Sequence, residues 1–547
     1  MPVEKLLVAN RGEIAVRVFR TCRELGIGTV AVVAPDDRGS LHARSADELA
    51  QISSYLDSEE HIRAARESGA DAIHPGYGFL AENAGFAAAV EAAGLTWVGP
   101  PSESLRLAGH KLEAKRVARG AGVPVLPDGE PEEIGFPLLV KAAAGGGGRG
   151  MRVVRSANEL DEALAAAERE AEGAFGDSTL YCERYLERPR HVEVQLLADA
   201  HGTVVGVGER DCSVQRRHQK VLEEAPAPGL SPALRTALLG AAVTFGEAVG
   251  YRGAGTVEFV LDGDEFFFLE LNGRIQVEHP VTEAVTGLDL VAEQLRIAAG
   301  DAVVTDGYQL QGHAVEVRLY AEDSRTFLPQ AGRIDRLDLP SVSFLRGDSG
   351  TVRVDAGVEE GDEVGLAYDP MIAKLIAHAS TREAALDTLA AALAETRVEG
   401  ALTNLPFLRW LVSHPVVRAG GATTAFLTEH PPLSALPVLR PPAAFRASWR
   451  LNLPAPPLAA PPDIDVESHR PGAAHGESTV TAPMPGTVIR VEIASGDAVR
   501  ARQPLVVLEA MKMEIPVHSP FEGTVKAVHV SEGDRIAGGS LLLELES

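Results

Sequence analysis

The chain contains few cysteines and no long apolar run. Cysteine occurs three times in 547 residues, at Cys22, Cys182 and Cys212. Three widely spaced thiols exclude a disulfide framework and a cysteine-based zinc site, and they fit a reducing compartment. No run of eighteen apolar residues exists, and the apolar part of the N-terminus is too short for a signal peptide. We therefore expect a cytoplasmic protein that does not bind a membrane.

Positive charge is also scarce. The formal net charge is −26, and no basic tail is visible. A nucleic-acid-binding protein would be expected to carry the opposite sign, so that class is excluded. An acidic protein that handles anionic substrates must concentrate cations locally, and basic clusters are therefore informative. The length is sufficient for three or four domains.

The usual nucleotide fingerprints are absent. The opening residues predict a strand at Leu6–Ala9, a helix from Ile14 to Leu25, a strand at Thr29–Val33 and a further strand ending at Ile73. This βαβ pattern indicates a Rossmann-like sheet. The pattern lacks G-x-G-x-x-G, so no dinucleotide is inferred. The glycine-rich segment at 145–150 is not a Walker A loop, because no G-K-[ST] sequence follows it.

What the chain does contain is an internal repeat near its C-terminus. Residues 482–509 and 519–546 match at an offset of 37, and short Val, Ile and Leu runs broken by Gly and Asp predict strands and turns. Between the repeats stands Ala510-Met511-Lys512-Met513. A pseudo-twofold β-sandwich would place Lys512 at a hairpin tip. An ordinary turn lysine is the alternative, and the repeat makes it improbable.

Two segments of the body combine cations with unusual backbone. An apolar strand leads to Lys141 and then to a loop containing Gly145, Gly146, Gly147 and Gly148. Such a loop lets backbone N–H groups approach phosphate oxygens, although a flexible hairpin without a ligand is an equal alternative. The segment 209–220 is rich in cations. If it were one strand, Gln215, Arg217 and Gln219 would face one way and Arg216, His218 and Lys220 the other. A solvated basic face is the alternative there.

A third segment gathers oxygen ligands. Glu258 and Glu270–Asn272 fall on two apolar strands joined by the turn Asp262-Gly263. Two carboxylates and an amide oxygen suit Mg²⁺ that bridges ATP phosphates. Arg274, Gln276 and Glu278 follow directly, and they could hold a planar oxyanion and supply a base. Exposed edge-strand acids are the alternative, which the apolar neighbours disfavour.

Other features predict the domain layout. Ser156–Glu159 has the pattern of a capping box before a helix to about Glu172, and a second helix is predicted over Arg382–Glu395. Eleven of the 46 positions in 431–476 are proline, which indicates a linker of partly polyproline character. Phe445 and Trp449 are apolar residues inside this linker that could anchor part of it to the body or to a partner.

The C-terminal repeat resembles the biotinyl carrier domain of biotin-dependent carboxylases, with the related lipoyl domain as the near rival. The methionines beside the lysine favour biotin. Residues 3–430 resemble the biotin carboxylase family of the ATP-grasp fold. The resemblance rests on the strings A-N-R-G-E-I-A, H-P-G-Y-G-F-L-A-E-N, E-R-D-C-S-V-Q-R-R-H-Q-K and R-I-Q-V-E-H-P.

The resemblance implies a role for each matching residue. Biotin would be covalently bound to Lys512. ATP would be held by Lys111, Lys141, Gly145, Gly146, Gly147, Gly148, Glu183, Arg184, Tyr185, Leu186, His191, Gln215, His218, Glu258 and Glu270. Mg²⁺ or Mn²⁺ would be held by Glu258, Glu270 and Asn272. Bicarbonate would be held by Lys220, Arg274, Gln276 and the backbone of Val277, with Glu278 as its base. Arg318 would face the ureido oxygen of biotin.

The sequence departs from the family pattern in three places. Arg184 stands where a lysine is frequent, and the segment 46–55 is shorter than usual. Gly273 replaces the usual Thr or Pro between Asn272 and Arg274, which we expect to loosen the loop. None of these changes removes a group with an implied catalytic role.

The fold class expected from the resemblance is α/β and α+β multidomain. It comprises a Rossmann-like N-terminal domain over 1–111 and an ATP-grasp domain over 112–312, with a mobile lid at about 128–200. A C-terminal biotin carboxylase domain over 313–430, the linker over 431–476 and an all-β biotinyl/lipoyl-type sandwich over 477–547 complete the layout.

The implied activity is ATP- and bicarbonate-dependent carboxylation of biotin on the chain's own carrier domain. Because no carboxyltransferase sequence is present, we expect the α-subunit of an acyl-CoA carboxylase with a separate carboxyltransferase β-subunit. A biotin protein ligase and a second copy of the body are further expected partners. The alternatives are a subunit of a pyruvate or other non-CoA carboxylase, and a non-catalytic biotin carrier scaffold.

Overall fold

The computed structural model describes most of the chain, in two compact units. The described residues are 2–143, 151–175, 177–216, 219–305, 308–340, 350–432, 478–482, 486–510, 513–536 and 540–546. One unit comprises Met1–Ser324, Gly332–Val364 and Met371–Pro431. The other comprises Arg325–Ala331, Gly365–Pro370 and Pro432–Ser547. The predicted linker, with Phe445 and Trp449, lies largely outside the described residues.

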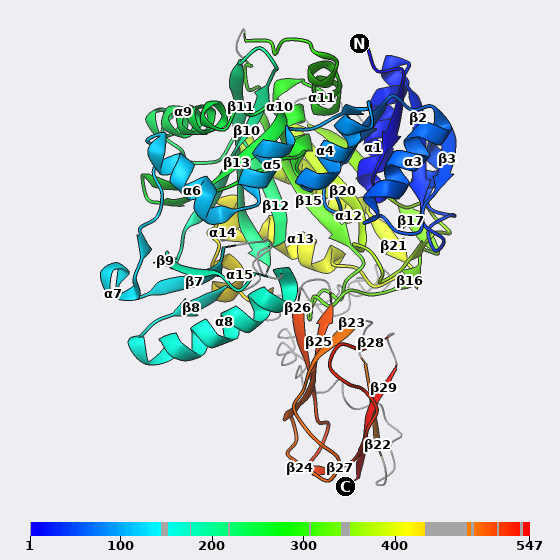
Figure 1. Ribbon diagram of the computed structural model, residues 1–547, viewed down its shortest axis with the longest axis vertical. Coiled ribbons are helices and arrows are strands. Elements are labelled where there is room, and N and C mark those ends of the chain that lie inside the picture. Colours follow the sequence, from blue (N-terminus) through cyan, green and yellow to red (C-terminus); the bar gives the residue numbers. More distant parts are fainter. Residues whose placement is uncertain are drawn as a thin grey trace, which may run out of the picture. The chain divides into compact units, whose positions relative to one another are not determined.

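The first unit begins with a parallel five-stranded sheet of order β3-β2-β1-β4-β5 (Figure 1). Its strands are β1 (Lys5–Val8), β2 (Gly28–Val33), β3 (Glu48–Gln51), β4 (Ala72–His74) and β5 (Thr96–Trp97). Its helices are α1 (Gly12–Leu25), α2 (Leu41–Ser45), α3 (Ser58–Ser68), α4 (Ala84–Ala92) and α5 (Ser102–Ala108). The apolar face of α1 packs into a core with β1. The predicted Rossmann-like start is therefore confirmed to within a few residues at each boundary.

The centre of this unit is an antiparallel eight-stranded sheet of order β14-β13-β10-β11-β12-β15-β20-β18. Its strands are β10 (Arg190–Ala198), β11 (Val204–Arg216), β12 (Gln219–Ala225), β13 (Gly253–Asp262), β14 (Glu265–Asn272), β15 (His313–Tyr320), β18 (Thr351–Ala356) and β20 (Met371–Ala379). Strands on both sides of the predicted boundary at 312/313 pair within it, since β12 pairs with β15. One sheet therefore carries residues from two predicted domains.

Helices pack against this sheet, and their apolar side chains form a hydrophobic core with those of its strands. They are α6 (Lys111–Gly120), α9 (Pro232–Ala248), α10 (His279–Thr286), α11 (Leu290–Ala299), α12 (Arg382–Glu395) and α13 (Leu405–Ser413). Leu238 and Phe245 of α9 pack against Val194 of β10 and Phe268 of β14. The predicted helix Arg382–Glu395 and the predicted hairpin around Asp262-Gly263 are both confirmed.

A small antiparallel sheet of order β6-β9-β7-β8 occupies the region predicted as the lid. Its elements are β6 (Asp128–Gly129), α7 (Pro131–Ile134), β7 (Leu138–Ala142), β8 (Arg152–Val154), the 3₁₀ turn η1 (Ala157–Glu159), α8 (Leu160–Phe175) and β9 (Leu180–Arg184). The predicted capping box is wrong in detail. The hydroxyl of Ser156 donates to the carboxylate of Glu159 at 3.0 Å, so neither side chain caps the backbone of the other, and η1 precedes α8.

Two short pairs and two short helices complete the first unit. They are β16 (Gly332–Arg333) with β19 (Glu363–Val364), β17 (Arg336–Asp338) with β21 (Arg397–Glu399), α14 (Pro415–Arg418) and α15 (Phe426–Glu429).

The C-terminal part of the second unit is a sandwich of two four-stranded sheets, of orders β22-β29-β27-β24 and β26-β25-β23-β28. The strands are β22 (Ser478–Thr481), β23 (Gly486–Val491), β24 (Ala498–Val499), β25 (Pro504–Ala510), β26 (Met513–His518), β27 (Gly523–Val528), β28 (Arg535–Ile536) and β29 (Leu541–Glu546). The 37-residue offset converts one sheet order into the other, strand by strand, which confirms the predicted pseudo-twofold sandwich. β25 and β26 pair antiparallel, with Ala510 opposite Met513. Lys512 itself lies outside the described residues.

Candidate active site

A buried cluster of charges surrounds Lys220 at the start of β12. Its Nζ lies 2.8 Å from Oε1 of Glu258 on β13 and 2.6 Å from Oε1 of Glu278, and it also pairs with Glu193 of β10. Burial opposes the charge of Lys220, but these three carboxylates outweigh it and raise its pKa well above the ordinary value. Lys220 is therefore positively charged, and it contacts carboxylates from three different parts of the chain.

Glu278 connects Lys220 to Arg318. Its Oε2 accepts from Nη2 of Arg318 at 3.0 Å, and the same Nη2 lies beside Glu223 of β12. Glu278 is buried, yet Lys220, Arg318 and Arg210 overcome the cost of burial and hold its pKa well below the ordinary value. The carboxylate is thus ionised and held between two predicted substrate-binding cations.

Arg274 lies in the loop that leads from β14 to α10. Its guanidinium donates to Glu82 at 3.0 Å, to Oε1 of Gln276 at 2.8 Å and to Oδ1 of Asn272 at 3.1 Å. Gly273, expected to loosen this loop, is buried, and a Cβ there would lie 2.6 Å from Cδ2 of Leu105. Its lack of a side chain therefore allows a close approach to α5.

The predicted metal ligands come together on the β13–β14 hairpin. Glu258 and Glu270 lie directly opposite in the register, and Nδ2 of Asn272 donates to Oε1 of Glu258 at 2.9 Å. Burial and the neighbouring Glu258 raise the pKa of Glu270. Two crowded carboxylates whose repulsion a cation would relieve, together with an amide oxygen, fit a hard divalent ion such as Mg²⁺ or Mn²⁺.

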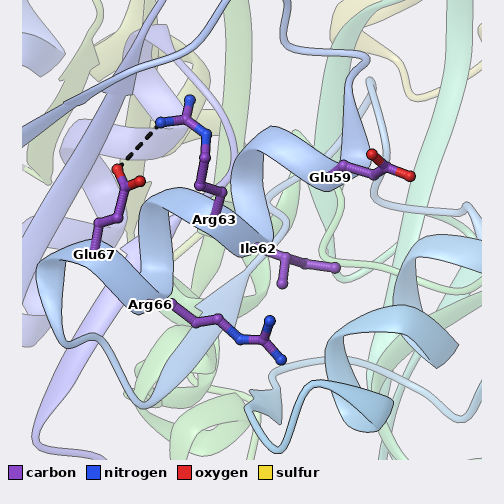
Figure 2. A pocket seen from close by; sticks show the side chains of 5 residues that line it. All are labelled: Glu59, Ile62, Arg63, Arg66 and Glu67. Carbon is purple, nitrogen blue, oxygen red and sulfur yellow. Dashed lines mark hydrogen bonds and ion pairs between the residues drawn. The ribbon is translucent and has the colours of Figure 1, made fainter.

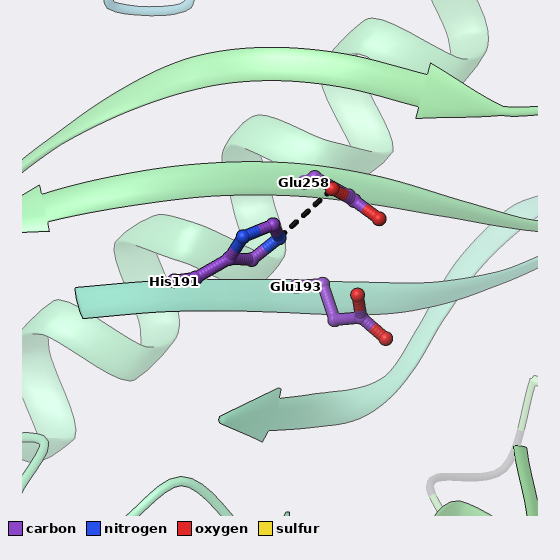
Figure 3. A group of neighbouring side chains, drawn as sticks. All are labelled: His191, Glu193 and Glu258. Atoms are coloured by element: carbon purple, nitrogen blue, oxygen red, sulfur yellow. Dashed lines mark ion pairs between the residues drawn. The ribbon is translucent and has the colours of Figure 1, made fainter. Parts of the chain in front are cut away.

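A second group of ligand-type side chains shares Glu258. His191, Glu193 and Glu258 offer atoms that all lie within 4.8 Å of one another, and Nε2 of His191 is 2.8 Å from Oε2 of Glu258 (Figure 3). Lys220 and Arg210 already balance Glu193 in this group, whereas Glu270 on the hairpin has no ion pair among the described residues. The oxygen set on the hairpin therefore suits a divalent ion better than this trio does.

The predicted nucleotide residues form a second charged group, in the small sheet and α6. Lys141 of β7 pairs with the buried carboxylate of Glu183 on β9. Burial raises and Lys141 and Lys115 lower the pKa of Glu183, with a net decrease. Burial lowers the pKa of Lys111 at the start of α6. Arg184 is exposed, Tyr185 is half-buried and Leu186 is buried, while Gly145–Gly148 lie outside the described residues.

The structure corrects the predicted single strand over 209–220. β11 ends at Arg216 and β12 begins at Gln219, and the register places Gln215 opposite Lys220. Gln215 and Lys220 therefore share a face, because directly paired residues point the same way. Nε2 of Gln215 lies 2.8 Å from Nδ1 of His191, which unites two predicted nucleotide residues. Arg217 and His218 lie outside the described residues.

Sequence reasoning missed several residues that hold this site together. They are Glu82 beside Arg274, Lys115 beside Glu183, Glu193 beside Lys220 and Glu223 beside Arg318. A signal existed for Glu193, since it follows His191 by two positions on the same strand, and alternate residues of a strand share a face. The other three depend on contacts between residues 68 or more apart in the chain.

A hollow on the surface along α3 is lined by Glu59, Ile62, Arg63, Arg66 and Glu67 (Figure 2). Arg63 and Glu67 pair at 3.1 Å across one helical turn. None of the predicted site residues lies there, and the charge pattern is that of a solvated helix face.

Family models match four parts of the chain. They are "Biotin carboxylase, N-terminal domain" at residues 2–105, "Carbamoyl-phosphate synthase L chain, ATP binding domain" at 129–305, "Biotin carboxylase C-terminal domain" at 316–429 and "Biotin-requiring enzyme" at 478–545. Among the described residues, no helix combines the length and apolar character needed to cross a membrane.

Individual relatives match the body. The biotin carboxylase of Halalkalibacterium halodurans is 46% identical over 448 residues, which is 78% of this chain and 98% of that one. The mitochondrial methylcrotonoyl-CoA carboxylase subunit alpha of Glycine max is 47% identical over 451 residues, but the match spans only 61% of its length. A solved structure, the biotin carboxylase domain dimer of Hydrogenobacter thermophilus 2-oxoglutarate carboxylase with MgADP, ADP and bicarbonate, has a TM-score of 0.76. It is 42% identical, and the match covers 79% of this chain and 98% of that one.

Proposed function

The chain belongs to the biotin carboxylase family and carries a C-terminal biotin/lipoyl-type domain, and from this we propose that it is the α-subunit of an acyl-CoA carboxylase. Its ATP-dependent half-reaction would carboxylate biotin held on Lys512. The observation that supports the site most directly is Glu278, ionised and held between Lys220 and Arg318 beside the Glu258–Glu270 hairpin.

Two groups of residues would hold the two anionic substrates. Lys111, Lys141 and the glycine loop are suited to the phosphates of ATP, with Glu183, His191 and Gln215 nearby. A Mg²⁺ or Mn²⁺ ion on Glu258, Glu270 and Asn272 would neutralise phosphate charge. Arg274, Gln276, Lys220 and the Val277 backbone are suited to bicarbonate, since a guanidinium fork matches a planar oxyanion.

Glu278 would take the proton of bicarbonate as its oxygen attacks the γ-phosphate of ATP. A base works best when its pKa lies near the operating pH, whereas the pKa of Glu278 is held well below the ordinary value when only protein cations surround it. Bicarbonate and ATP are anions that would share those cations. Their binding would therefore raise the pKa of Glu278 towards the useful range.

Arg318 would act on the second part of the half-reaction. The first part would leave ADP and carboxyphosphate, and carboxyphosphate would break down to CO₂ and phosphate. Biotin would supply the ureido nitrogen that accepts CO₂, while the phosphate takes the proton of that nitrogen. The guanidinium of Arg318 is buried and already fixed by Glu278 and Glu223, so it could stabilise negative charge on the ureido oxygen without reorganising.

The proposal of an acyl-CoA as the final acceptor rests on which domains occur together on this chain. A biotin carboxylase body and a carrier domain occur on one chain, and relatives over 78% of it are named methylcrotonoyl-CoA carboxylase subunit alpha. A separate carboxyltransferase subunit and a biotin protein ligase would be partners, and a body-to-body homodimer would resemble the domain dimer solved for the Hydrogenobacter enzyme.

The test is purification of the native complex followed by a substrate panel. Acetyl-, propionyl- and methylcrotonyl-CoA are offered with ATP and labelled bicarbonate, alongside pyruvate and 2-oxoglutarate. We expect label in at least one acyl-CoA. Label only in a 2-oxo acid would instead support the second candidate, which the 42% identity to a 2-oxoglutarate carboxylase domain favours.

A further inference from the structure

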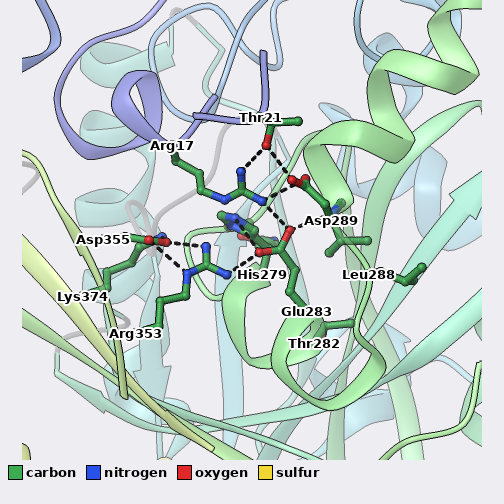
Figure 4. A network of polar contacts seen from close by, with 12 residues as sticks. Arg17, Thr21, His279, Thr282, Glu283, Leu288, Asp289, Arg353, Asp355 and Lys374 are labelled. Carbon is green, nitrogen blue, oxygen red and sulfur yellow. Dashed lines mark hydrogen bonds and ion pairs between the residues drawn. The ribbon is translucent and has the colours of Figure 1, made fainter. Parts of the chain in front are cut away.

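Two buried side chains, Lys374 and His279, contact backbone carbonyl oxygens of the turn at 276–278, which leads into α10. Nζ of Lys374, on β20, donates to the carbonyl oxygen of Val277 at 2.8 Å. Nδ1 of His279 lies 2.7 Å from the carbonyl oxygen of Gln276. Both side chains are fully buried, and Figure 4 shows them within a network that includes Arg17, Glu283, Arg353 and Asp355.

His279 is a neutral donor in this arrangement. Burial and the nearby cations Lys374, Arg17 and Arg353 hold its pKa well below the ordinary value. A neutral imidazole carries one ring proton, and a carbonyl oxygen can only accept, so the contact with Gln276 places that proton on Nδ1. The other ring nitrogen has no hydrogen-bond partner in the described part of the chain.

These two contacts fix two successive peptide planes. In a planar trans peptide the carbonyl and the following N–H point in opposite directions. The carbonyl of Gln276 shares its plane with the N–H of Val277, and the carbonyl of Val277 shares its plane with the N–H of Glu278. His279 and Lys374 therefore direct both N–H groups away from the buried network.

Burial of the charged Lys374 side chain costs more free energy than burial of an apolar side chain of similar size would. Its ammonium is 0% exposed and is balanced by Glu13 at 3.1 Å and, more weakly, by Asp355 at 4.0 Å. A buried ion pair is often no more stabilising than apolar side chains of similar volume. An apolar residue could fill this space, but it could not donate to the Val277 carbonyl.

We propose that Lys374 and His279 are positioning residues for bicarbonate, which aim the Val277 and Glu278 amides by holding the opposite carbonyls. This inference rests on the proposed function, in which the Val277 backbone binds bicarbonate. The two residues touch no substrate themselves. Their effect is on the turn that also carries the side chains of Gln276 and Glu278.

The test uses the full-length chain and steady-state kinetics with ATP, bicarbonate and free biotin. Lys374→Met keeps the length of the side chain and removes the donor, so the KM for bicarbonate is expected to rise at least tenfold. The KM for ATP should stay within about twofold, because the lysines around Glu183 are untouched. Lys374→Arg retains a donor and should restore most of the bicarbonate affinity.

His279 offers an independent pair of variants. Asn places an amide N–H near the position of Nδ1, whereas Leu removes the donor at similar volume. We expect a much larger rise in bicarbonate KM for His279→Leu than for His279→Asn.

Arg353→Met is the matched control for a purely structural network. Arg353 contacts Glu283 and Asp355, and no residue of the turn at 276–278 is among its partners in the described residues. It should lower the melting temperature and leave the bicarbonate KM unchanged, because His279 keeps its Nδ1 proton whether the ring is neutral or charged. If Lys374→Met fails to fold, Lys374→Met combined with Glu13→Gln removes the stranded acid and is measured instead.

Three results would decide against the inference. An unchanged bicarbonate KM in the folded methionine variant would overturn it, as would an equal rise in Arg353→Met. Wild-type protein without bicarbonate-dependent ATP cleavage would overturn the proposed function, and the inference with it.

Discussion

At the scale of single residues, Glu278 and Arg318 form one ion pair, but we expect their alanine variants to lose different activities. Arg318→Ala should abolish carboxylation of free biotin and retain part of the bicarbonate-dependent ATP cleavage, because its charge is proposed to act on biotin. Glu278→Ala should abolish both, because bicarbonate activation comes first. Parallel assays of biotin carboxylation and phosphate release check this.

The roles assigned to Glu278 and Arg318 would be wrong if both variants lost the two activities in equal proportion. Arg382→Ala provides a control that removes an arginine bound to Glu224, the neighbour of Glu223 on β12, without touching Glu278. It should change both activities by a similar, small factor.

A buried acid beside this pair predicts a pH dependence of stability. Glu316 on β15 is 0% exposed, and neither carboxylate oxygen has a hydrogen-bond partner in the described residues. Burial raises its pKa well above the ordinary value, so the folded state favours the protonated acid. Below a pH of about 4.5 both states are protonated. Above it, the unfolded chain ionises first and the folded state loses relative stability, by up to about 1.4 kcal/mol per pH unit.

Glu316→Gln removes this titration. We expect the variant to be more stable than wild type at pH 7, with an advantage that shrinks steadily towards pH 5. Urea denaturation at four pH values measures the difference. Glu395→Gln, at an exposed acid that ends α12, should show no such trend. A stability difference for Glu316→Gln that does not vary with pH would contradict the assignment.

At the scale of elements, local signals predicted some of the site and could not predict the rest. The β13–β14 hairpin was predictable because apolar strands flank an Asp-Gly turn, and it carries the proposed metal ligands with it. The β11–β12 hairpin was missed because Arg216 to Gln219 contains no glycine or proline. Contacts such as Lys374 with Val277 join residues 97 positions apart, and no local periodicity specifies such a partner.

The β13–β14 hairpin yields a prediction about metal dependence. Glu270→Gln keeps the size of the side chain and removes one of two facing carboxylates. The Mg²⁺ concentration for half-maximal ATP cleavage should rise at least tenfold, because a neutral amide is a weaker ligand for a hard cation. A magnesium titration at fixed ATP measures this.

The control for that titration lies on the same strand. Glu265 begins β14 and is exposed, so Glu265→Gln should not shift the magnesium requirement. An equal shift in both variants would show that the effect comes from overall charge, not from ligand loss.

At the scale of the whole molecule, the central sheet explains how distant segments form one site. Glu278 follows β14 at one edge of the sheet, whereas Arg318 lies on β15, beyond β12. The predicted domain boundary at 312/313 would separate them, but the pairing of β12 with β15 brings Arg318 to Glu278. The sequence resemblance predicted both residues for one site, and only the sheet order accounts for their contact.

The division into two units leads to a prediction about Lys512. The body contains the described charged cluster, and the sandwich provides the paired strands β25 and β26 that flank Lys512 in sequence. Lys512→Arg should abolish biotin attachment, because the ligase forms an amide with a primary amine that arginine lacks. Carboxylation of free biotin should persist, since the body is unchanged, whereas acyl-CoA carboxylation by the assembled complex should fall to background.

Lys526→Arg, at the other lysine of the sandwich, serves as the control and should keep both avidin binding and acyl-CoA turnover. Avidin blotting and intact mass measure attachment, and biotin retained by Lys512→Arg would refute the assignment.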